Sequence, residues 1–289
     1  MLLDDGITFI EGENHGHYPY SNSLLIKDKV TALIDAGIGK SIEELAKKEK
    51  VDLIIHTHSH EDHIGGDDFF RSEIAIHSLE APILEKLERL ADLYGLESEE
   101  MISFIRGFFR HESLRVDHKF EDGYIFCLGD IQFRAIHTPG HSVGHTCFFE
   151  NERKILFSGD IDLSSFGPWY GALDSRIDDF ISSIKKVKAL RPQVVISSHK
   201  GVILDDIDDK FDVYLAKIYE REGRILSYLD SKKGRTLDSI VSQAFIYGKF
   251  PEVLHSWFVL MERIMVEKHL ERLIEMGEVG RTGDTFSSL

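Results

Sequence analysis

Three imidazoles and the Asp62 carboxylate fall within the six residues from His58 to His63, and no other feature constrains the fold as strongly. The stretch before them, 51–55, is a short apolar run typical of a buried strand, and Gly65-Gly66 after them frees the backbone to turn. Neutral imidazole nitrogens and a carboxylate oxygen are the ligands that zinc and its borderline neighbours prefer. The cluster therefore predicts a metal site at the end of a strand.

The spacing inside the cluster indicates how its ligands divide. His58 and His60 are two residues apart, so on an extended backbone their side chains point to the same side and can bind one ion. Asp62 and His63 are adjacent, and they need the start of a helix to aim at a second ion. His56 lies inside the predicted strand, where we expect a core histidine with a backbone partner rather than a ligand.

Composition places the chain among ordinary globular proteins. Its 289 residues are 42% hydrophobic and 29% charged, which is enough for one large domain or for two. No apolar run is long enough to span a membrane and no secretory signal is evident, so we expect a cytoplasmic protein. Cys127 and Cys147 are expected to be reduced and buried. The formal net charge of −16 argues against broad binding to nucleic acid or to membrane surfaces.

Four apolar strands are each predicted to run into a residue that could bind metal. In layered α/β folds the strand ends form the crevice where chemistry occurs, so ligands at several strand ends are expected to share one site. The strands and the residues that follow them are Ile55 with His58, Ile136 with His141, Phe157 with Asp160, and Ile196 with His199.

Further predicted elements surround these strand ends. A helix is expected from Ser41, as its N-cap, to Glu49, and two or more helices are expected over 78–107. Gly129-Asp130 predicts the turn of a hairpin. The loop at 11–20 is either a flap over the pocket or a surface loop. The aromatic loop at 161–171 either forms a wall of the pocket or packs on the helix after it.

The motif His58-x-His60-x-Asp62-His63, with His141 after Thr-Pro-Gly, Asp160 after Ser-Gly, and His199, resembles the metallo-β-lactamase superfamily. The resemblance covers roughly residues 6–204. It implies an α/β fold, the αβ/βα four-layer sandwich, in which two mixed sheets face each other with helices outside. No carboxylate replaces His60, as the oxygen-reducing diiron branch would require, so the resemblance does not favour redox chemistry.

The resemblance also implies how a dinuclear site would be built. His58, His60 and His141 would bind one ion; Asp62, His63 and His199 would bind the other, and Asp160 would bridge them. Two divalent ions are expected, zinc being usual in the family and iron or manganese occurring in some members. Asp35 matches the family's early aspartate, which hydrogen-bonds near the ligands and orients imidazoles.

The last ligand motif departs from the pattern of many relatives, which read Pro-Gly-His-Gly where this chain reads Ser-Ser-His199-Lys200-Gly. The ligand is kept, but its neighbours change. Lys200 either reaches an anionic substrate or stays solvated.

Residues 205–289 are predicted to form a second, helical domain after a catalytic domain at 1–204. Helices are expected over 205–229, 236–247 and 254–276, followed by the turn and strand of a wing at 277–281. The pattern resembles the winged-helix-like tail of the lactamase-like endoribonuclease branch. A helix that enters a DNA groove should be basic, yet 262–275 carries four acids and three bases. We therefore expect this segment to pack on the rest of the chain or to form a homodimer.

Together these features predict a metal-dependent hydrolase that uses a metal-bridged hydroxide as nucleophile. Asp62 and Asp160 would position the hydroxide, and Asp62 would act as the catalytic residue that passes a proton to the leaving group. His145 is either a pocket residue or a structural histidine. The favoured substrate is a small ester, thioester or lactone, because the acidic chain disfavours polyanions. The alternatives are a single-stranded RNA endonuclease and, from a different class, a non-catalytic metal-binding protein.

Overall fold

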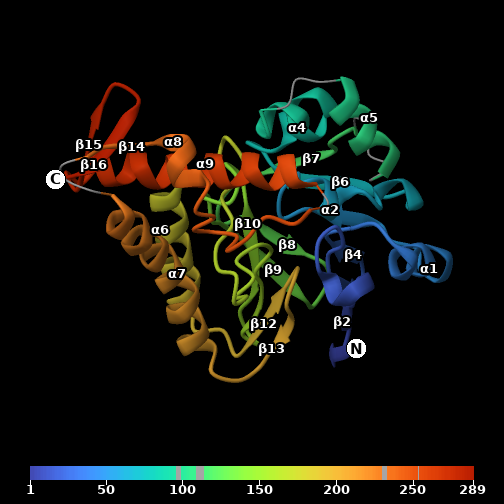
Figure 1. Cartoon of the computed structure of the whole chain (residues 1–289). Coiled ribbons are helices and arrows are strands. Elements are labelled where there is room, and N and C mark those ends of the chain that lie inside the picture. The colour runs from blue at the N-terminus through green and yellow to red at the C-terminus, as the bar shows by residue number, and fades with distance from the viewer. Residues whose placement is uncertain (96–98, 109–113, 230–232, 253) are drawn as a thin grey trace.

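Two β-sheets face each other at the centre of the computed structural model, which describes residues 1–95, 99–108, 114–229, 233–252 and 254–289 (Figure 1). In the first sheet seven strands lie in the order β1 to β7. Strands β1 to β4 pair antiparallel and β4 to β7 pair parallel, so the sheet is mixed. The strands are β1 Leu2–Asp4, β2 Ile7–Ile10, β3 Ser23–Lys27, β4 Thr31–Ile34, β5 Leu53–Ile55, β6 Glu73–His77 and β7 His118–Phe120.

The second sheet has the order β13-β12-β11-β10-β9-β8 and is mixed as well. Only the β11–β12 pair among these strands is parallel. The hairpin predicted around Gly129-Asp130 is confirmed, because the Leu128 N–H donates to the Ile131 carbonyl at 3.0 Å between β8 and β9. The strands are β8 Ile125–Cys127, β9 Gln132–His137, β10 Thr146–Glu150, β11 Ile155–Phe157, β12 Val194–Ser197 and β13 Gly201–Ile203.

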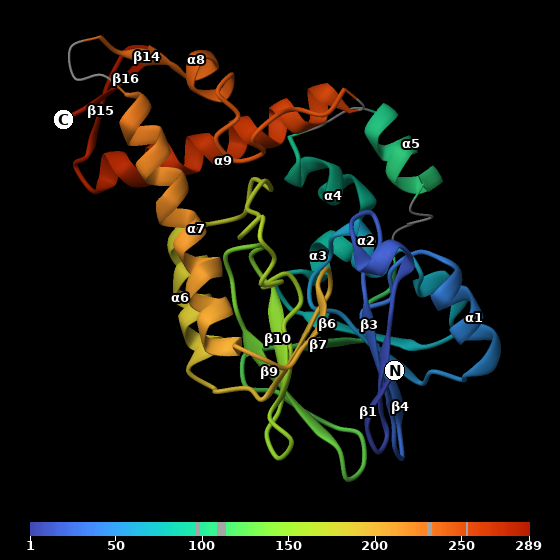
Figure 2. The same ribbon diagram turned by 60° about the horizontal axis from the view of Figure 1, so that its bottom comes forward.

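Helices cover the outer face of each sheet. Helix α1 (Lys40–Lys48) packs on the first sheet, and α6 (Ile177–Lys188) and α7 (Ile207–Tyr228) pack on the second (Figure 2). The inner faces bury one apolar cluster between them, and its removal from water is the main force that holds the sheets together. The cluster includes Ile7, Phe9, Leu24, Ile26, Phe133, Phe148, Phe157 and Ile196. The predicted αβ/βα sandwich is thus confirmed.

Two local predictions are wrong. Helix α1 begins at Lys40, with Gly39 rather than Ser41 as its N-cap, because the Glu13 carboxylate accepts the Lys40 N–H and takes the capping role. Cys127 is exposed, whereas Cys147 is buried as expected, and both are free. In β8 successive side chains alternate between the faces of the sheet, and the inward position belongs to Phe126.

The segment between β6 and β7 is helical, as predicted for 78–107. Its helices are α3 (Ala81–Leu84), α4 (Leu87–Leu93) and α5 (Glu99–Phe108). Residues 96–98 and 109–113 of this segment lie outside the described part of the chain. In Figure 2, α3 and α4 lie beside α2 (Glu61–Ile64), so this insertion borders the histidine cluster.

Residues after 204 form α7, α8 (Leu237–Val241), α9 (His255–Glu275) and a small sheet in the order β14-β16-β15. Helix α8 is shorter than the predicted 236–247. After it Ala244 adopts a left-handed conformation (φ 49°), and the Glu262 carboxylate accepts the N–H groups of Ile246 and Tyr247 that a helix would have paired. The small strands are β14 Arg235–Thr236, β15 Val279–Thr282 and β16 Thr285–Ser288.

One hydrophobic cluster extends from the second sheet through α6 and α7 to α9 and β16, from Ile136 to Phe286. The C-terminal segment is therefore packed on the sandwich through a continuous apolar core. The domain division at 204/205 and the winged-helix resemblance stay predictions. Among the described residues, no helix has the length and apolar character needed to cross a membrane.

Candidate metal centre

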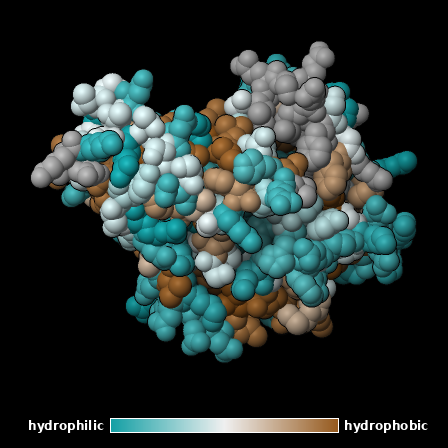
Figure 3. Space-filling model, viewed as in Figure 1, coloured by the Kyte–Doolittle hydropathy of each residue, from teal (hydrophilic) through white to brown (hydrophobic). Residues whose placement is uncertain are grey.

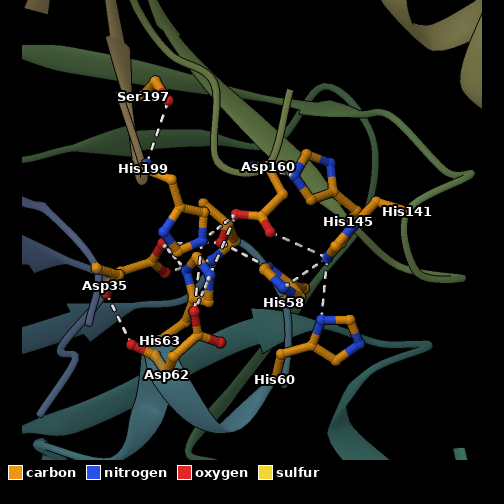
Figure 4. A network of polar contacts seen from close by, with 12 residues as sticks. Asp35, His58, His60, Asp62, His63, His141, His145, Asp160, Ser197 and His199 are labelled. Atoms are coloured by element: carbon orange, nitrogen blue, oxygen red, sulfur yellow. Dashed lines mark hydrogen bonds and ion pairs between the residues drawn. The ribbon is translucent and has the colours of Figure 1, made fainter. Parts of the chain in front are cut away.

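The cluster from His58 to His63 leaves the end of β5 and enters the short helix α2. His60 is the extended residue at which α2 begins (φ −66°, ψ 147°). Asp62 and His63 consequently lie on a helical turn, which is the geometry they need to aim at a second ion. All four predicted ligands of this stretch are buried, and Figure 4 shows how their side chains lie.

The first predicted ion site is a meeting point of three imidazole nitrogens. His141 Nε2 lies 3.1 Å from His58 Nε2 and 2.9 Å from His60 Nδ1. The opposite nitrogen of His141, Nδ1, donates to the Trp169 carbonyl at 3.0 Å, which orients the ring with Nε2 toward the two other imidazoles. His58 Nδ1 similarly contacts Thr57 Oγ1 at 2.9 Å, so its Nε2 also turns a lone pair toward the centre.

The second predicted ion site brings Asp62, His63 and His199 together (Figure 4). Asp62 Oδ2 lies 3.6 Å from His63 Nε2 and 3.4 Å from His199 Nε2. Asp160 stands between the two sites, because its Oδ1 is 3.2 Å from His63 Nε2 while its Oδ2 is 3.2 Å from His141 Nε2. This is the position that a bridging carboxylate requires.

Charge is distributed unevenly over the two groups. Burial lowers the pKa of His58 and His60 well below the ordinary range, and neighbouring imidazoles lower it further, so both are neutral. Burial alone would lower the pKa of His63, but the Asp62 and Asp160 carboxylates outweigh it and raise that pKa well above its ordinary value. Burial would raise the pKa of Asp160, yet the nearby imidazoles, led by His199, hold it well below its usual range. Asp160 is therefore ionised and attracts positive charge.

The residues present fit a pair of divalent ions. His63 Nε2 and Asp160 Oδ1 are buried and make no hydrogen bond within the described chain. A buried polar atom without a partner costs free energy, and a bound cation would satisfy both atoms at once. Imidazole nitrogens with carboxylate oxygens are, moreover, the donor set that zinc prefers.

Comparison with known families identifies the superfamily to which the chain belongs. The profile of the "Metallo-beta-lactamase superfamily" matches residues 19–199, which includes every predicted ligand. The chain belongs to the metallo-β-lactamase superfamily. It is similar to an "Acyl-coenzyme A thioesterase MBLAC2" from Homo sapiens (28% identical, covering 80% of this chain and 86% of the relative). The protein of that name from Gallus gallus is 30% identical over the same shares of the two chains.

Solved structures of the superfamily share the fold over the whole length of this chain. A metallo-β-lactamase family protein from Thermus thermophilus aligns with a TM-score of 0.77 at 23% identity and covers 100% of both chains. A β-lactamase domain protein from Burkholderia ambifaria has a TM-score of 0.76 at 16% identity, covering 100% of this chain and 93% of its own. Both alignments therefore extend over the part of the chain after residue 204.

Asp35 holds the metallo-β-lactamase motif in place through hydrogen bonds to Thr57 and His63. Its Oδ1 accepts the Thr57 N–H, and its Oδ2 accepts both the Thr57 hydroxyl and the Nδ1–H of His63, each at 2.8 Å. The neighbouring imidazoles, His63 first, outweigh burial and lower the pKa of Asp35 to about 2. Asp35 thus fixes the ring of His63 with Nε2 toward the second ion site, as the resemblance implied.

Glu80 is a supporting residue that sequence reasoning missed. It is fully buried and joins the two ligand loops of the first ion site. Its Oε2 accepts the hydroxyl of Ser59 at 2.5 Å, and its Oε1 accepts the Ser142 hydroxyl at 2.6 Å and the Gly144 N–H at 2.7 Å. The signal was available, because Glu80 follows the strand predicted at 74–76 just as the ligands follow theirs.

His56 is buried as predicted, but a backbone partner for its ring was the wrong expectation. Its Nε2 lies 2.9 Å from Asp67 Oδ2, and its Nδ1 faces Asp35 at 3.7 Å. Burial would lower the pKa of His56, yet these two carboxylates, Asp67 first, outweigh it and raise that pKa to about 9. A cationic imidazole between two buried carboxylates is better paired than one on a carbonyl.

His145 takes a structural place behind Asp160. Its Nε2 accepts the backbone N–H of Asp160 at 3.1 Å, and its Nδ1 lies 2.9 Å from Thr138 Oγ1. Burial lowers the pKa of His145 to about 3, so the ring stays neutral and can accept that bond. The alternative of a structural histidine is the one that fits these contacts.

The loop at 11–20 reaches the second ion site. The Gly16 carbonyl accepts the Nδ1–H of His199 at 2.6 Å, and the Tyr18 hydroxyl donates to Glu61 Oε1 at 3.1 Å. This loop therefore lies over the ligands rather than on a remote surface. By contrast, the side chain of Lys200 is exposed beside the site.

Proposed function

We propose that this protein is a metal-dependent hydrolase of acyl thioesters that uses two divalent ions, with zinc favoured and iron or manganese as alternatives. The observation that carries the proposal is the convergence of two groups of ligands on Asp160, whose two oxygens face one group each. The names of the relatives support the thioester, because similar chains are called acyl-coenzyme A thioesterases. One fungal relative, 31% identical over 49% of this chain, is called an atrochrysone carboxyl ACP thioesterase.

When bound, a pair of divalent ions supplies a water whose pKa is lowered to about 7 and polarises the carbonyl oxygen of the substrate. Asp160 would fix the spacing of the two ligand groups. Asp62 turns Oδ2 toward His63 and His199, so its other oxygen can take a proton from the attacking water. Asp62 would pass that proton to the sulfur as the carbon–sulfur bond breaks. A thiol has a pKa near 8.5, so its thiolate leaves with little help, which suits a single carboxylate as the proton donor.

An apolar wall beside the first ion site supports an acyl substrate. The rings of Tyr94 and Trp169 each lie 5.8 Å from the ring of His60, and Trp257 lies 5.1 Å from Tyr94. These aromatic residues belong to a cluster that joins α4 to α9 and also contains Ile83, Leu90, Met261, Ile264 and Leu260. Figure 3 shows apolar residues reaching the surface at the level of α9. Most of this cluster is packed core, but Trp169, Trp257 and Leu260 are only partly buried. These three side chains would contact the hydrocarbon part of a thioester.

A substrate panel tests the proposal. The zinc-loaded protein should be assayed against acetyl-, octanoyl- and palmitoyl-coenzyme A, a lactone, a simple ester and single-stranded RNA. We expect thioester turnover with KM falling as the chain lengthens, because each buried methylene contributes about 0.8 kcal/mol. Hydrolysis of RNA without acyl turnover would replace this proposal with the endonuclease. Tight zinc binding with no turnover of any substrate would favour a non-catalytic metal-binding protein.

Cytoplasmic location and a homodimer through residues 205–289 stay predictions of the sequence. Light scattering of the full chain and of a variant with an altered C-terminal surface would decide the oligomeric state. A small-molecule substrate is the only partner that the thioesterase proposal needs.

A further inference from the structure

The ligand His141 is held at two points by a segment that has neither helix nor strand. This segment, residues 161–176, connects β11 to α6. The Trp169 carbonyl accepts the Nδ1–H of His141 at 3.0 Å, and the Ser175 hydroxyl donates to the His141 carbonyl at 2.7 Å. Both the ring orientation and the backbone position of His141 therefore depend on how firmly this segment is held.

Arg221 on α7 grips the first of these points. Its Nη1 donates to the Pro168 carbonyl at 2.5 Å and to the Tyr170 hydroxyl at 2.9 Å, while its Nη2 donates to the Phe166 carbonyl at 2.7 Å. Arg221 is only 3% exposed. The planar fork of a guanidinium can hold acceptors on both sides of Trp169 in one fixed arrangement, which an ammonium on a flexible stem cannot do.

A buried chain of hydrogen bonds joins the same loop to α9. The Tyr170 hydroxyl lies 2.5 Å from His269 Nε2, and His269 Nδ1 lies 3.3 Å from Glu222 Oε1. Arg272 Nη1 donates to the same Glu222 oxygen at 2.6 Å. Each member has a donor and an acceptor, so the network is satisfied throughout and fixes Tyr170 in place.

Lys268 on α9 grips the second point. Its Nζ donates to the carbonyls of Ser175, at 2.7 Å, and Leu173, at 3.1 Å. Ser175 is the residue whose hydroxyl holds the backbone of His141. The two cations thus act on the two ends of the segment that carries both contacts to the ligand.

We propose that Arg221 and Lys268 are positioning residues for the predicted ligand His141, acting through backbone carbonyls of residues 161–176. The proposal rests on the metal centre of the proposed function. It assigns a task to the C-terminal helices, which is to set one ligand of the first ion site rather than to bind nucleic acid. A purely structural role for Arg221 would instead lower stability without a selective effect on this loop or this ion.

The test compares Arg221→Lys with Arg224→Lys as its matched control. Arg224 lies on the same helix and also donates to a carbonyl, but its acceptor is Phe245, at 2.6 Å, rather than a residue of 161–176. Amide hydrogen exchange in the metal-free protein reports on the loop. Competition with a chelator reports the affinity for each zinc ion, and thermal unfolding reports stability.

We expect Arg221→Lys to speed amide exchange over residues 166–171. It should also lower the affinity for one of the two zinc ions by about 10–100-fold, as loss of a contact that orients a ligand does. Arg224→Lys should leave the exchange over residues 166–171 and the zinc affinity at wild-type values. Equal exchange and equal zinc affinity in the two variants, with similar losses of Tm, would overturn the proposal.

Lys268→Met provides a second variant, should Arg221→Lys fail to fold. It should speed exchange over residues 172–176 and weaken the same zinc ion, and unchanged exchange there would overturn the proposal. Failure of the metal centre itself has a different signature. Wild-type protein would then bind no zinc, while hydrogen exchange would still decide whether Arg221 and Lys268 hold the loop.

Discussion

The two halves of the candidate site are built in different ways. The predicted ligands from His58 to His63 occupy one stretch, shaped by the end of β5 and the first turn of α2. The other three, His141, Asp160 and His199, come from three separate loops after β9, β11 and β12. Local backbone geometry aims the first set, whereas contacts from distant parts of the chain aim the second.

The supports of the two sets differ in the same way. Asp35 braces the first set through side-chain bonds to Thr57 and His63. The second set is held mainly through backbone carbonyls, because Trp169 and Gly16 each accept an Nδ1–H from a predicted ligand. For the contiguous motif, sequence can therefore identify both the predicted ligands and the side chain that supports them. For the dispersed set, sequence can identify the predicted ligands but not the backbone carbonyls that support them.

Removing a predicted ligand should have the largest effect on hydrolysis and on bound zinc. That effect should be the same whichever of the two sets the ligand comes from. We expect His58→Ala from the first set and Asp160→Ala from the second each to reduce hydrolysis to background and to lower bound zinc, because both ions depend on a shared arrangement. Elemental analysis and thioesterase assays measure both outcomes. His118→Ala, which alters an exposed histidine paired with Glu73, is the control. Full metal content and full rate in both ligand variants would remove the basis for the site.

Much of this arrangement could be predicted from the residues alone. Apolar runs predict the strands, and helical periodicity predicts the insertion at 78–107. Four strands run into His58, His141, Asp160 and His199, and the family resemblance implies the full set of seven ligands. The carbonyls of Trp169 and Gly16 could not be predicted, because every residue carries a carbonyl and no side chain marks those that matter. The truncation of α8 escaped prediction for a related reason, since a distant carboxylate, Glu262, competes for its N–H groups.

Substituting Asp35, which hydrogen-bonds to the first set of predicted ligands, should have the next largest effect on zinc binding. Asp35→Asn keeps an oxygen for Thr57 but places an amide, which cannot accept, against the Nδ1–H of His63. We expect about a 10–100-fold loss of zinc affinity, concentrated on the ion of the second site. Chelator competition measures this loss. An equal loss at both ions would mean that Asp35 supports the whole fold rather than His63.

Glu80 offers a smaller test that links the two halves. It accepts bonds from Ser59 in the first ligand stretch and from Ser142 beside the dispersed ligand His141. In Glu80→Gln one of these acceptors becomes a donor, so we expect zinc affinity to fall about 10-fold, at the low end for residues that support ligands. Glu85→Gln, at a surface ion pair with Lys119, should bind zinc as the wild type does. A wild-type affinity in Glu80→Gln would show that the two ligand loops hold their positions independently.

The smallest expected effect is a pH dependence of stability that arises from His269, in the hydrogen-bonded network that holds Tyr170. His269 is buried between Tyr170 and Glu222, and burial lowers its pKa below the ordinary value of about 6.5. From about pH 7 upward the ring is mostly neutral in both the folded and the unfolded state, so His269 has little effect on the slope of stability there. As the pH falls below about 6.5, the unfolded chain gains a proton that the folded chain refuses, and stability is lost.

His269→Gln removes this titration while keeping a donor for Glu222 and an acceptor for Tyr170. Denaturant unfolding of the metal-free protein should therefore show the wild type losing stability relative to His269→Gln between about pH 7 and pH 5, and a constant difference above pH 7. His255→Gln, an exposed change in the first turn of α9, should follow the wild-type curve. Parallel curves for wild type and His269→Gln would mean that the network tolerates a charged imidazole. The set formed by His141, Asp160 and His199 would then be no more sensitive to acid than the set from His58 to His63. The two sets would differ only in where along the chain their supporting residues lie.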